Sequence, residues 1–367
     1  MKYIFVFLLL VGFCASAQTD AALDAAKKKM DSKDYAGAKA DLSKLIESNP
    51  KNKKALTMRG RVRMALNDYY GAIGDFTSVL EMDSTLADAF NYRGESKINL
   101  GDNDGAIADL DKAVRFNSNY GEAYTNRGFA KYNNEDLQGA YFDFSKALEI
   151  GPASDDKYFN RGVIKAEFGE YVSAIDDYSK AIELDKTDAN LFNYRGVAYY
   201  NTSNFDLAIT DYNEAIKLDA KDATKFENRA LAKSAKEDLK GALEDYNKAI
   251  ELTPDSETYN LRGVLKYTMQ DYDGAIADYT KAIELDATNP TYFDNRALSK
   301  TEKEDYTGAV EDYSSSIEIY PTDPETYFQR GLVKLTMNNN YDGCLDLKRA
   351  EELGSQEAKA AIKKSCK

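Results

Sequence analysis

The chain has 367 residues, of which 62 are acidic and 48 are basic, so its net charge at neutral pH is −14. It contains no histidine, which excludes histidine-based acid–base catalysis, Ser-His and Cys-His nucleophiles, and the imidazole ligands of many metal sites. An acidic surface also disfavours nucleic acid and anionic membranes as partners. We expect no metal and no cofactor.

The first 17 residues have the features of a secretory signal peptide. Lys2 provides a short positive segment, residues 3–13 form an apolar run that is too short for a stable membrane anchor, and a small-residue cleavage site ends at Ala17. We therefore expect an exported protein, periplasmic or extracellular. A lipoprotein anchored at Cys14 is the alternative, which Phe13 disfavours because that cleavage requires a small residue at this place. No second long apolar run follows, so we expect no membrane insertion.

From Thr19 onward, one pattern repeats about every 34 residues, which predicts an array of similar structural units. When a unit is numbered from 1 to 34, position 7 is arginine and position 23 is aspartate in nearly every unit. Position 4 is mostly aromatic, position 8 is glycine or alanine, position 20 is small, position 24 is large, and position 27 is small in most units. The predicted units begin at Thr19, Lys53, Ala87, Gly121, Asp155, Ala189, Ala223, Ser256, Pro290 and Pro324.

These spacings are helical. Positions 4, 7, 8 and 11 form one stripe, and positions 20, 23, 24 and 27 form another, with a short polar segment between them. Each unit is therefore predicted to be an antiparallel helical hairpin whose small residues let the two helices approach closely. All six prolines lie between units, where they interrupt no helix.

This pattern resembles the tetratricopeptide repeat family, whose consensus has an aromatic residue at position 4, Gly or Ala at 8, Ala at 20 and 27, an aromatic residue at 24 and Pro at 32. The resemblance implies an all-α fold, namely a right-handed superhelix (α-solenoid) of about ten helical hairpins. It also implies a concave groove lined by the first helix of each unit. We expect the repeat array over residues 18–354 and a C-terminal capping helix over residues 355–367.

The arginine at position 7 lies in a packing stripe and needs a counter-charge. Its partner is either the aspartate 16 residues later in its own unit or the aspartate about 18 residues earlier in the preceding unit. We favour the second arrangement, a structural ladder between units, because the first unit has Asp41 but carries Ala25 at position 7. Its predicted pairs include Asp41 with Arg59, Asp75 with Arg93, Asp177 with Arg195, and Asp312 with Arg330. We interpret the lysines at position 11 as solvent-reaching residues, and a basic strip for an acidic ligand is the alternative.

Positions 2, 5, 6, 9, 12 and 13 of the first helices would line the groove of such a superhelix. An amide recurs at position 5 or 6 and could hold the backbone of an extended peptide, because it both donates and accepts hydrogen bonds. A solvated polar face is the alternative. Tyrosines at position 12 would add apolar contact or pack between units. The candidate groove residues are Asn91, Asn126, Asn160, Asn193, Asn228, Asn260, Asn295, Tyr132, Tyr200 and Tyr267.

Two cysteines remain near the C-terminus after removal of the signal peptide. Gly354 and Ser355 separate two predicted helices, and folding one back on the other brings Cys344 close to Cys366. A disulfide between them would stabilise the cap by about 3 kcal/mol on the chain-entropy model. Two free thiols are the alternative.

These features favour a non-catalytic exported scaffold that binds a protein or an extended peptide in its groove. A stable assembly subunit of a cell-envelope complex is the second hypothesis. A carboxylate-dependent glycosidase is the third, and it needs two acids at a defined separation. No unit carries an acid pair that distinguishes it from the other units. The pattern does not identify the partner or the oligomeric state.

Overall fold

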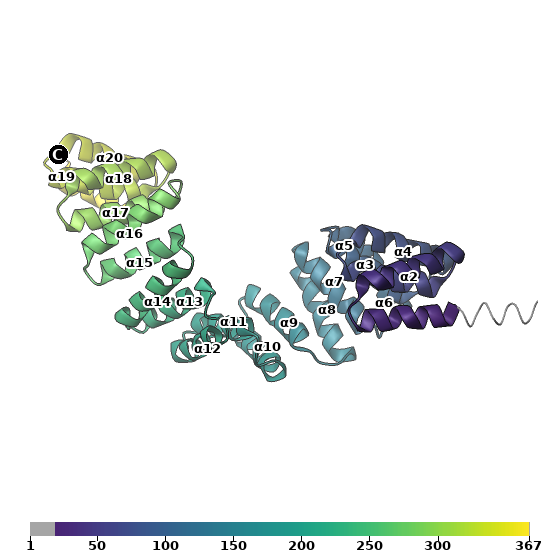
Figure 1. The fold of residues 1–367 in the computed structure, drawn as a ribbon. Coiled ribbons are helices and arrows are strands. Elements are labelled where there is room, and N and C mark those ends of the chain that lie inside the picture. Colours follow the sequence, from purple (N-terminus) through teal and green to yellow (C-terminus); the bar gives the residue numbers. More distant parts are fainter. Residues whose placement is uncertain (1–18, 367) are drawn as a thin grey trace, which may run out of the picture. The chain divides into compact units, whose positions relative to one another are not determined.

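The computed structural model describes residues 19–366, which form helices joined by short turns, with no strand within this range. The predicted signal peptide lies outside the described residues. Contacts divide the chain into two bodies at the boundary between Asp185 and Lys186, and each body is a stack of helical hairpins (Figure 1). Within residues 19–366, every helix is too short or too polar to span a bilayer. The fold is all-α, as predicted.

Each body holds five hairpins. The N-terminal body, residues 19–185, consists of a helix over residues 19–31 and then α2 (Tyr35–Ser48), α3 (Lys53–Ala65), α4 (Tyr69–Met82), α5 (Ala87–Ile98), α6 (Asn103–Phe116), α7 (Gly121–Asn133), α8 (Leu137–Ile150), α9 (Asp155–Glu167) and α10 (Tyr171–Leu184). The C-terminal body, residues 186–366, consists of α11 (Ala189–Asn201), α12 (Phe205–Leu218), α13 (Ala223–Ala235), α14 (Leu239–Leu252), α15 (Ser256–Thr268), α16 (Tyr272–Leu285), α17 (Pro290–Glu302), α18 (Tyr306–Ile319), α19 (Pro324–Thr336), α20 (Asn340–Glu352) and α21 (Gln356–Ser365). The predicted unit starts from Lys53 to Pro324 all coincide with the first residue of a helix.

The turn inside each hairpin has the same chemistry in most units. In the seventh unit, Glu237 lies two residues after the end of α13 and adopts the left-handed conformation, with a φ of 64°. The carboxylate of Asp238 then caps α14 by accepting a hydrogen bond from the backbone N–H of Gly241 at 3.0 Å. A Cβ on Gly241 would lie 2.2 Å from that carboxylate, so this close approach requires glycine.

The two helices of a hairpin cross where position 8 meets position 24. In the eighth unit, a Cβ on Gly263 would lie 2.6 Å from the ring of Tyr279, which is 2% exposed. The small residue therefore makes room for the aromatic ring of its own hairpin, and the ring fills the space that a larger side chain would occupy.

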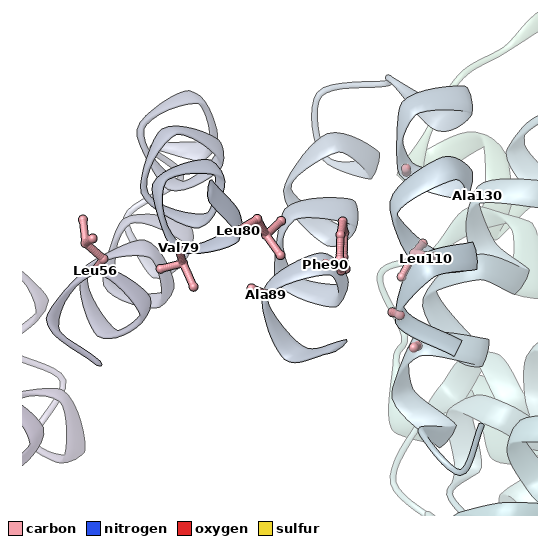
Figure 2. Close-up of a cluster of buried hydrophobic side chains, with 10 residues drawn as sticks. Leu56, Val79, Leu80, Ala89, Phe90, Leu110 and Ala130 are labelled. Carbon is pink, nitrogen blue, oxygen red and sulfur yellow. The ribbon is translucent and has the colours of Figure 1, made fainter. Parts of the chain in front are cut away.

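The core continues from one hairpin into the next and has no single centre. One buried cluster runs from Leu56 on α3, through Val79 and Leu80 on α4, to Phe90 on α5 and Leu110 on α6. Figure 2 shows these side chains in the layers between successive helices. This arrangement is typical of repeat arrays, in which each unit contacts mainly its neighbours.

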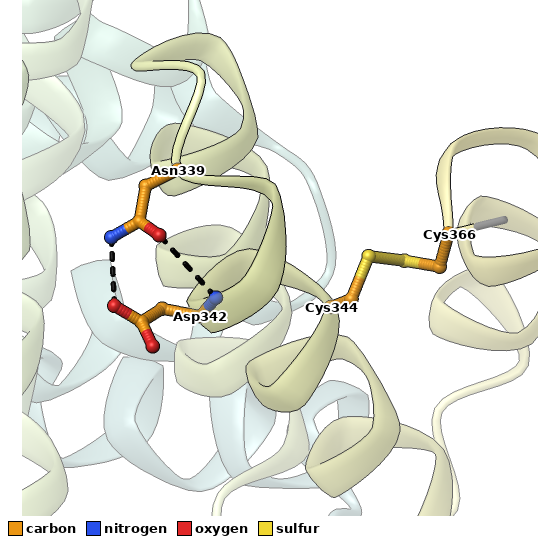
Figure 3. The surroundings of a disulfide bond; sticks show 4 residues. All are labelled: Asn339, Asp342, Cys344 and Cys366. Atoms are coloured by element: carbon orange, nitrogen blue, oxygen red, sulfur yellow. Dashed lines mark hydrogen bonds between the residues drawn. A yellow bond between two sulfur atoms is a disulfide. The ribbon is translucent and has the colours of Figure 1, made fainter.

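The last helix, α21, covers the end of the tenth hairpin. Its Ala358 is buried against Leu347 and Ala350 of α20, and Ser355 caps it by accepting the N–H of Ala358 at 3.1 Å. Cys344 and Cys366 form the predicted disulfide, with their Cα atoms 5.7 Å apart (Figure 3). The cap is thus held to the array covalently as well as by packing.

Candidate functional site

The charged residues inside the stripes pair within units, so the predicted ladder between units is wrong. Arg59 donates from Nε and Nη2 to Asp75 of its own unit at 3.0 and 2.6 Å, not to Asp41. The same two-bond pairing joins Arg93 to Asp109, Arg127 to Asp143, Arg161 to Asp177, Arg195 to Asp211, Arg229 to Asp245, Arg262 to Asp278, Arg296 to Asp312 and Arg330 to Asp346. The physical reason is the register of the hairpin, which places positions 7 and 23 at the same distance from the turn on facing helices.

The lysine at position 11 completes this cluster. Lys266 contacts Asp278 at 2.8 Å and has a side chain only 17% exposed, so it neither reaches freely into solvent nor forms a strip for a ligand. Lys29 takes the same role towards Asp41 in the first unit. That contact explains why Asp41 is present without an arginine at position 7. The recurrence of lysine one helical turn after arginine was the signal for this cluster, and its interpretation as a solvent-reaching residue is wrong.

The arginines also connect neighbouring units, through a residue other than the predicted aspartate. Nη1 of Arg93 donates to the hydroxyl of Thr77 in the preceding unit at 3.0 Å, and Nη1 of Arg229 donates to Asn213 at 2.7 Å. In most units a polar residue at position 25 therefore accepts the third hydrogen bond of the guanidinium, although Ser145 does not. The cluster ties the two helices of a hairpin together and anchors them to the unit before.

The predicted groove amides bond mainly to one another. Asn126, Asn228 and Asn295 donate from Nδ2 to the side-chain oxygens of Asn91, Asn193 and Asn260 in the preceding units at 2.9 to 3.1 Å. Asn160 donates instead to a backbone carbonyl of its own helix. Asn91 is fully buried and Asn260 is 7% exposed, so neither offers its amide to a ligand. These side chains align successive first helices, and the prediction of a free amide row is wrong for this part of the set.

The tyrosines at position 12 pack inside their own hairpins. The ring of Tyr200 lies 5.4 Å from the ring of Phe205, and that of Tyr267 lies 5.3 Å from the ring of Tyr272, centre to centre. Both partners stand at the start of the second helix. Tyr132 is 37% exposed. Tyr200 and Tyr267 therefore support the turn, and they also contact the next unit, at Ala232 and at Glu302 respectively.

A hollow of about 850 Å³ lies between the first helices of units one and two. Most of its lining residues stand at the predicted groove positions: Asp20, Leu23, Asp24, Lys27, Lys54, Thr57, Met58 and Arg61. Leu23 and Met58 give it an apolar lining, and its four cations, Lys27, Lys53, Lys54 and Arg61, outnumber its two acids, Asp20 and Asp24. We call it the basic hollow. It departs from the acidic character of the chain as a whole.

Acidic side chains follow directly on the next two units of the same face. The guanidinium of Arg61 lies over the ring of Tyr92, 5.4 Å from its centre. Glu95 lies one helical turn after Tyr92. Burial raises the pKa of Glu95, and the neighbouring carboxylate of Glu122 raises it further. Burial also raises the pKa of Tyr120. At the predicted groove positions of the N-terminal body, unit two thus carries Lys54 and Arg61 without an acid, unit one carries acids beside Lys27, and units three and four are acidic.

The C-terminal body has half-buried acids at position 5 of two first helices. The hydroxyl of Thr258 lies 2.6 Å from Glu227 of the preceding unit, whose pKa is raised by burial. Thr326 stands in the same way 3.3 Å from Asp294. Burial raises the pKa of Asp294 to about 6, although hydrogen bonds from Ser316 and Thr326 oppose that shift. These acids join units through hydroxyl groups.

Comparison with protein families finds the same repeat that the sequence suggested. Models described as tetratricopeptide repeat match residues 23–87, 189–222, 226–256 and 256–289, and one described as TPR repeat matches residues 164–203. Together these matches span about half of the chain, and none of them describes a catalytic family. No curated protein matches the chain significantly.

Solved structures of repeat proteins are similar in fold. The C-terminal part of a TPR repeat-containing protein from Cytophaga hutchinsonii shares 21% identity with a TM-score of 0.54, covering 64% of this chain and 97% of the other. Cut9, in its complex with Hcn1, shares 14% identity with a TM-score of 0.50, covering 95% and 84%. YrrB, a TPR protein with an unusual peptide-binding site, shares 24% identity, covering 50% and 94%, but its TM-score of 0.47 is too low for its site to be transferred.

Proposed function

Because the chain belongs to the tetratricopeptide repeat family, we propose that it is a non-catalytic scaffold that binds a segment of another protein on its groove face. The basic hollow carries this proposal. Groove positions of two successive units converge there on one concavity, which has the size and mixed apolar and polar lining of a ligand site.

The charges of this face suggest the kind of segment that it receives. Lys27 and Lys54 have no ion-pair partner among the described residues, whereas the neighbouring Lys53 pairs with Asp83. An apolar side chain would fill the hollow, and an acidic one next to it would offset the excess of cations over Asp20 and Asp24 in its lining. The acidic units that follow favour a basic or neutral continuation of the same extended segment.

Export is the second part of the proposal, and it rests on the N-terminal sequence. Residues 1–17 have the charge, length and cleavage site of a signal peptide. The intact mass of the protein purified from its native source tests this, since we expect a mature chain that begins at Gln18. A mass that retains residues 1–17 would contradict export by this route.

The binding proposal is tested by capture from native envelope extract. Bound proteins are identified by mass spectrometry, and the bound segment is mapped with overlapping peptides. Lys54→Glu combined with Arg61→Glu should weaken binding of the mapped peptide by about tenfold or more, because two attractive charges become repulsive. Lys221→Glu combined with Lys240→Glu makes the same charge change at exposed positions outside the hollow and should leave binding unchanged. Equal binding by both double variants would contradict the proposed site.

A permanent assembly subunit is the second candidate, favoured by the apolar lining of Leu23 and Met58. A partner held mainly by apolar contact stays bound at high salt, whereas a transient peptide held by charges dissociates, because salt screens exposed charges. Co-purification in high salt therefore separates the two functions.

A further inference from the structure

The first unit lacks two side chains that recur together from the third unit onward. In the third to tenth units, the arginine at position 7 lies over the aromatic ring at position 4, with 5.2 to 5.9 Å between the guanidinium carbon and the ring centre. The first unit has Ala22 and Ala25 at these positions. It nevertheless keeps the aspartate that would bind the arginine, Asp41.

A cavity of about 760 Å³ occupies the place of the missing pair. It is lined by Ala22 and Ala25 from the helix over residues 19–31, and by Asp41, Lys44 and Leu45 from α2, among others. The Asp41 side chain is 33% exposed, whereas the aspartates of the other units are at most 8% exposed. The carboxylate therefore faces an open space that is filled elsewhere in the array.

The hydrogen bonds of Asp41 show which group is missing. Lys29 contacts its Oδ2 at 2.5 Å, as the lysine at position 11 contacts Oδ2 in most other units. Its Oδ1 has no partner among residues 19–366. In each of the other nine units, Oδ1 accepts from Nη2 of the arginine at 2.6 to 2.8 Å. The oxygen that is left open is the one that elsewhere binds a guanidinium.

Lys44 indicates that an aromatic ring is missing as well. It stands at position 26, where Lys112 lies 5.3 Å from the ring centre of Phe90 and Lys180 lies 5.4 Å from that of Tyr158. In the first unit, Ala22 leaves Lys44 without a ring. The cavity thus presents both halves of a site for an aromatic residue and an arginine.

We propose that this cavity is a docking site for an arginine side chain, accompanied by an aromatic one, from a partner protein. The forked guanidinium matches the open Oδ1 of Asp41 better than the single ammonium of lysine does. The chain does not supply this arginine from its first 18 residues, which contain none. The site is separate from the groove and does not rest on the function proposed for it.

The test uses the peptide acetyl-Tyr-Ala-Ala-Arg-amide, which copies the spacing of positions 4 and 7, and the full protein with labelled alanine methyl groups. We expect saturable NMR shifts at Ala22 and Ala25. Replacing the arginine of the peptide by neutral citrulline should weaken binding by about tenfold or more, as should Asp41→Asn, because each removes a charge-assisted hydrogen bond. Asp31→Asn, at an exposed acid of the same helix outside both the cavity and the basic hollow, should change nothing.

Filling the cavity provides an independent measurement. The double variant Ala22→Tyr and Ala25→Arg restores the pattern of the other units, so it should abolish the peptide shifts and raise the melting temperature. Equal binding of the citrulline peptide, unchanged binding by Asp41→Asn, or shifts outside the cavity would overturn the proposal. A double variant that fails to fold would contradict the equivalence of the units.

Discussion

The charge cluster of the eighth unit allows the pairing within units to be tested by stability. Asp278 accepts two hydrogen bonds from Arg262, at 2.8 and 2.6 Å, and contacts Lys266 at 2.8 Å. The side chain of Asp278 is only 4% exposed, and those of the two cations are 16% and 17% exposed. Asp278→Leu leaves both cations without a counter-charge, so we expect a loss of about 3–5 kcal/mol.

A double-mutant cycle isolates the pair itself. Arg262→Met should lower the free energy of unfolding by about 3 kcal/mol, at the lower end of the range for breaking a buried ion pair, because Lys266 still neutralises Asp278. Once Asp278 is leucine, the same change should cost less, which gives a coupling energy of about 2 kcal/mol. The matched control is the cycle of Arg262 with Asp245, the pair that a ladder between units would couple. It should be additive within about 0.5 kcal/mol, because Asp245 binds Arg229 instead.

Urea unfolding followed by circular dichroism measures these differences, provided that the dependence on urea concentration stays the same among the variants. Because a long array can unfold in parts, amide hydrogen exchange in α15 and α16 provides a second, local measurement. A coupling of Arg262 with Asp245 as large as that with Asp278 would refute the reasoning from hairpin register.

Three further outcomes follow from the turns, the cap and the buried acid. Glu304 has a φ of 61°, so Glu304→Gly should raise the free energy of unfolding by about 1 kcal/mol, whereas Gly101→Ala, at a φ of 78°, should lower it by about the same amount in thermal unfolding. Replacing Cys344 and Cys366 by serine should lower the free energy of unfolding by about 3 kcal/mol, and faster amide hydrogen exchange should appear first in α21. Burial raises the pKa of Asp294 to about 6, so the folded state binds this proton more tightly than the unfolded chain does and loses stability as the pH rises from about 4 to 7. In urea unfolding, the free energy of unfolding of Asp294→Asn should therefore exceed that of the wild type by on the order of 1 kcal/mol at pH 7 and should equal it at pH 4. The difference is small because water still reaches the carboxyl group.

The wrong prediction of a ladder between units rested on one residue. Asp41 has no arginine in its own unit, and this absence made pairing with the next unit the simpler interpretation. The interpretation treated the arginine as the only cation available. Lys29, one helical turn further along, lies beside Asp41 in the structure, and its equivalents accompany the arginine in most of the other units. Counting charges along the stripe showed that a partner was needed but did not identify it.

The partners of the groove amides could not be predicted from the sequence for a different reason. Asn91 and Asn126 recur at neighbouring positions of successive units, as a row of ligand-binding amides would. A bond between two such side chains leaves the same periodic pattern in the sequence as a bond from each of them to a peptide. The contact from Asn126 to Asn91 depends on the rotation of one hairpin against the next, and no spacing along a single helix contains that rotation.

Periodicity and residue chemistry were sufficient for the hairpins, their boundaries and their turns, because a helix places residues three and four apart on one face wherever it occurs. An aspartate at a helix start likewise acts within a few residues of the chain. The charge partners, the burial of the amides, the basic hollow and the cavity beside Asp41 depend instead on which helices meet and at what register. That information arises when the hairpins pack against one another, so it is visible only once the helices are placed together in space.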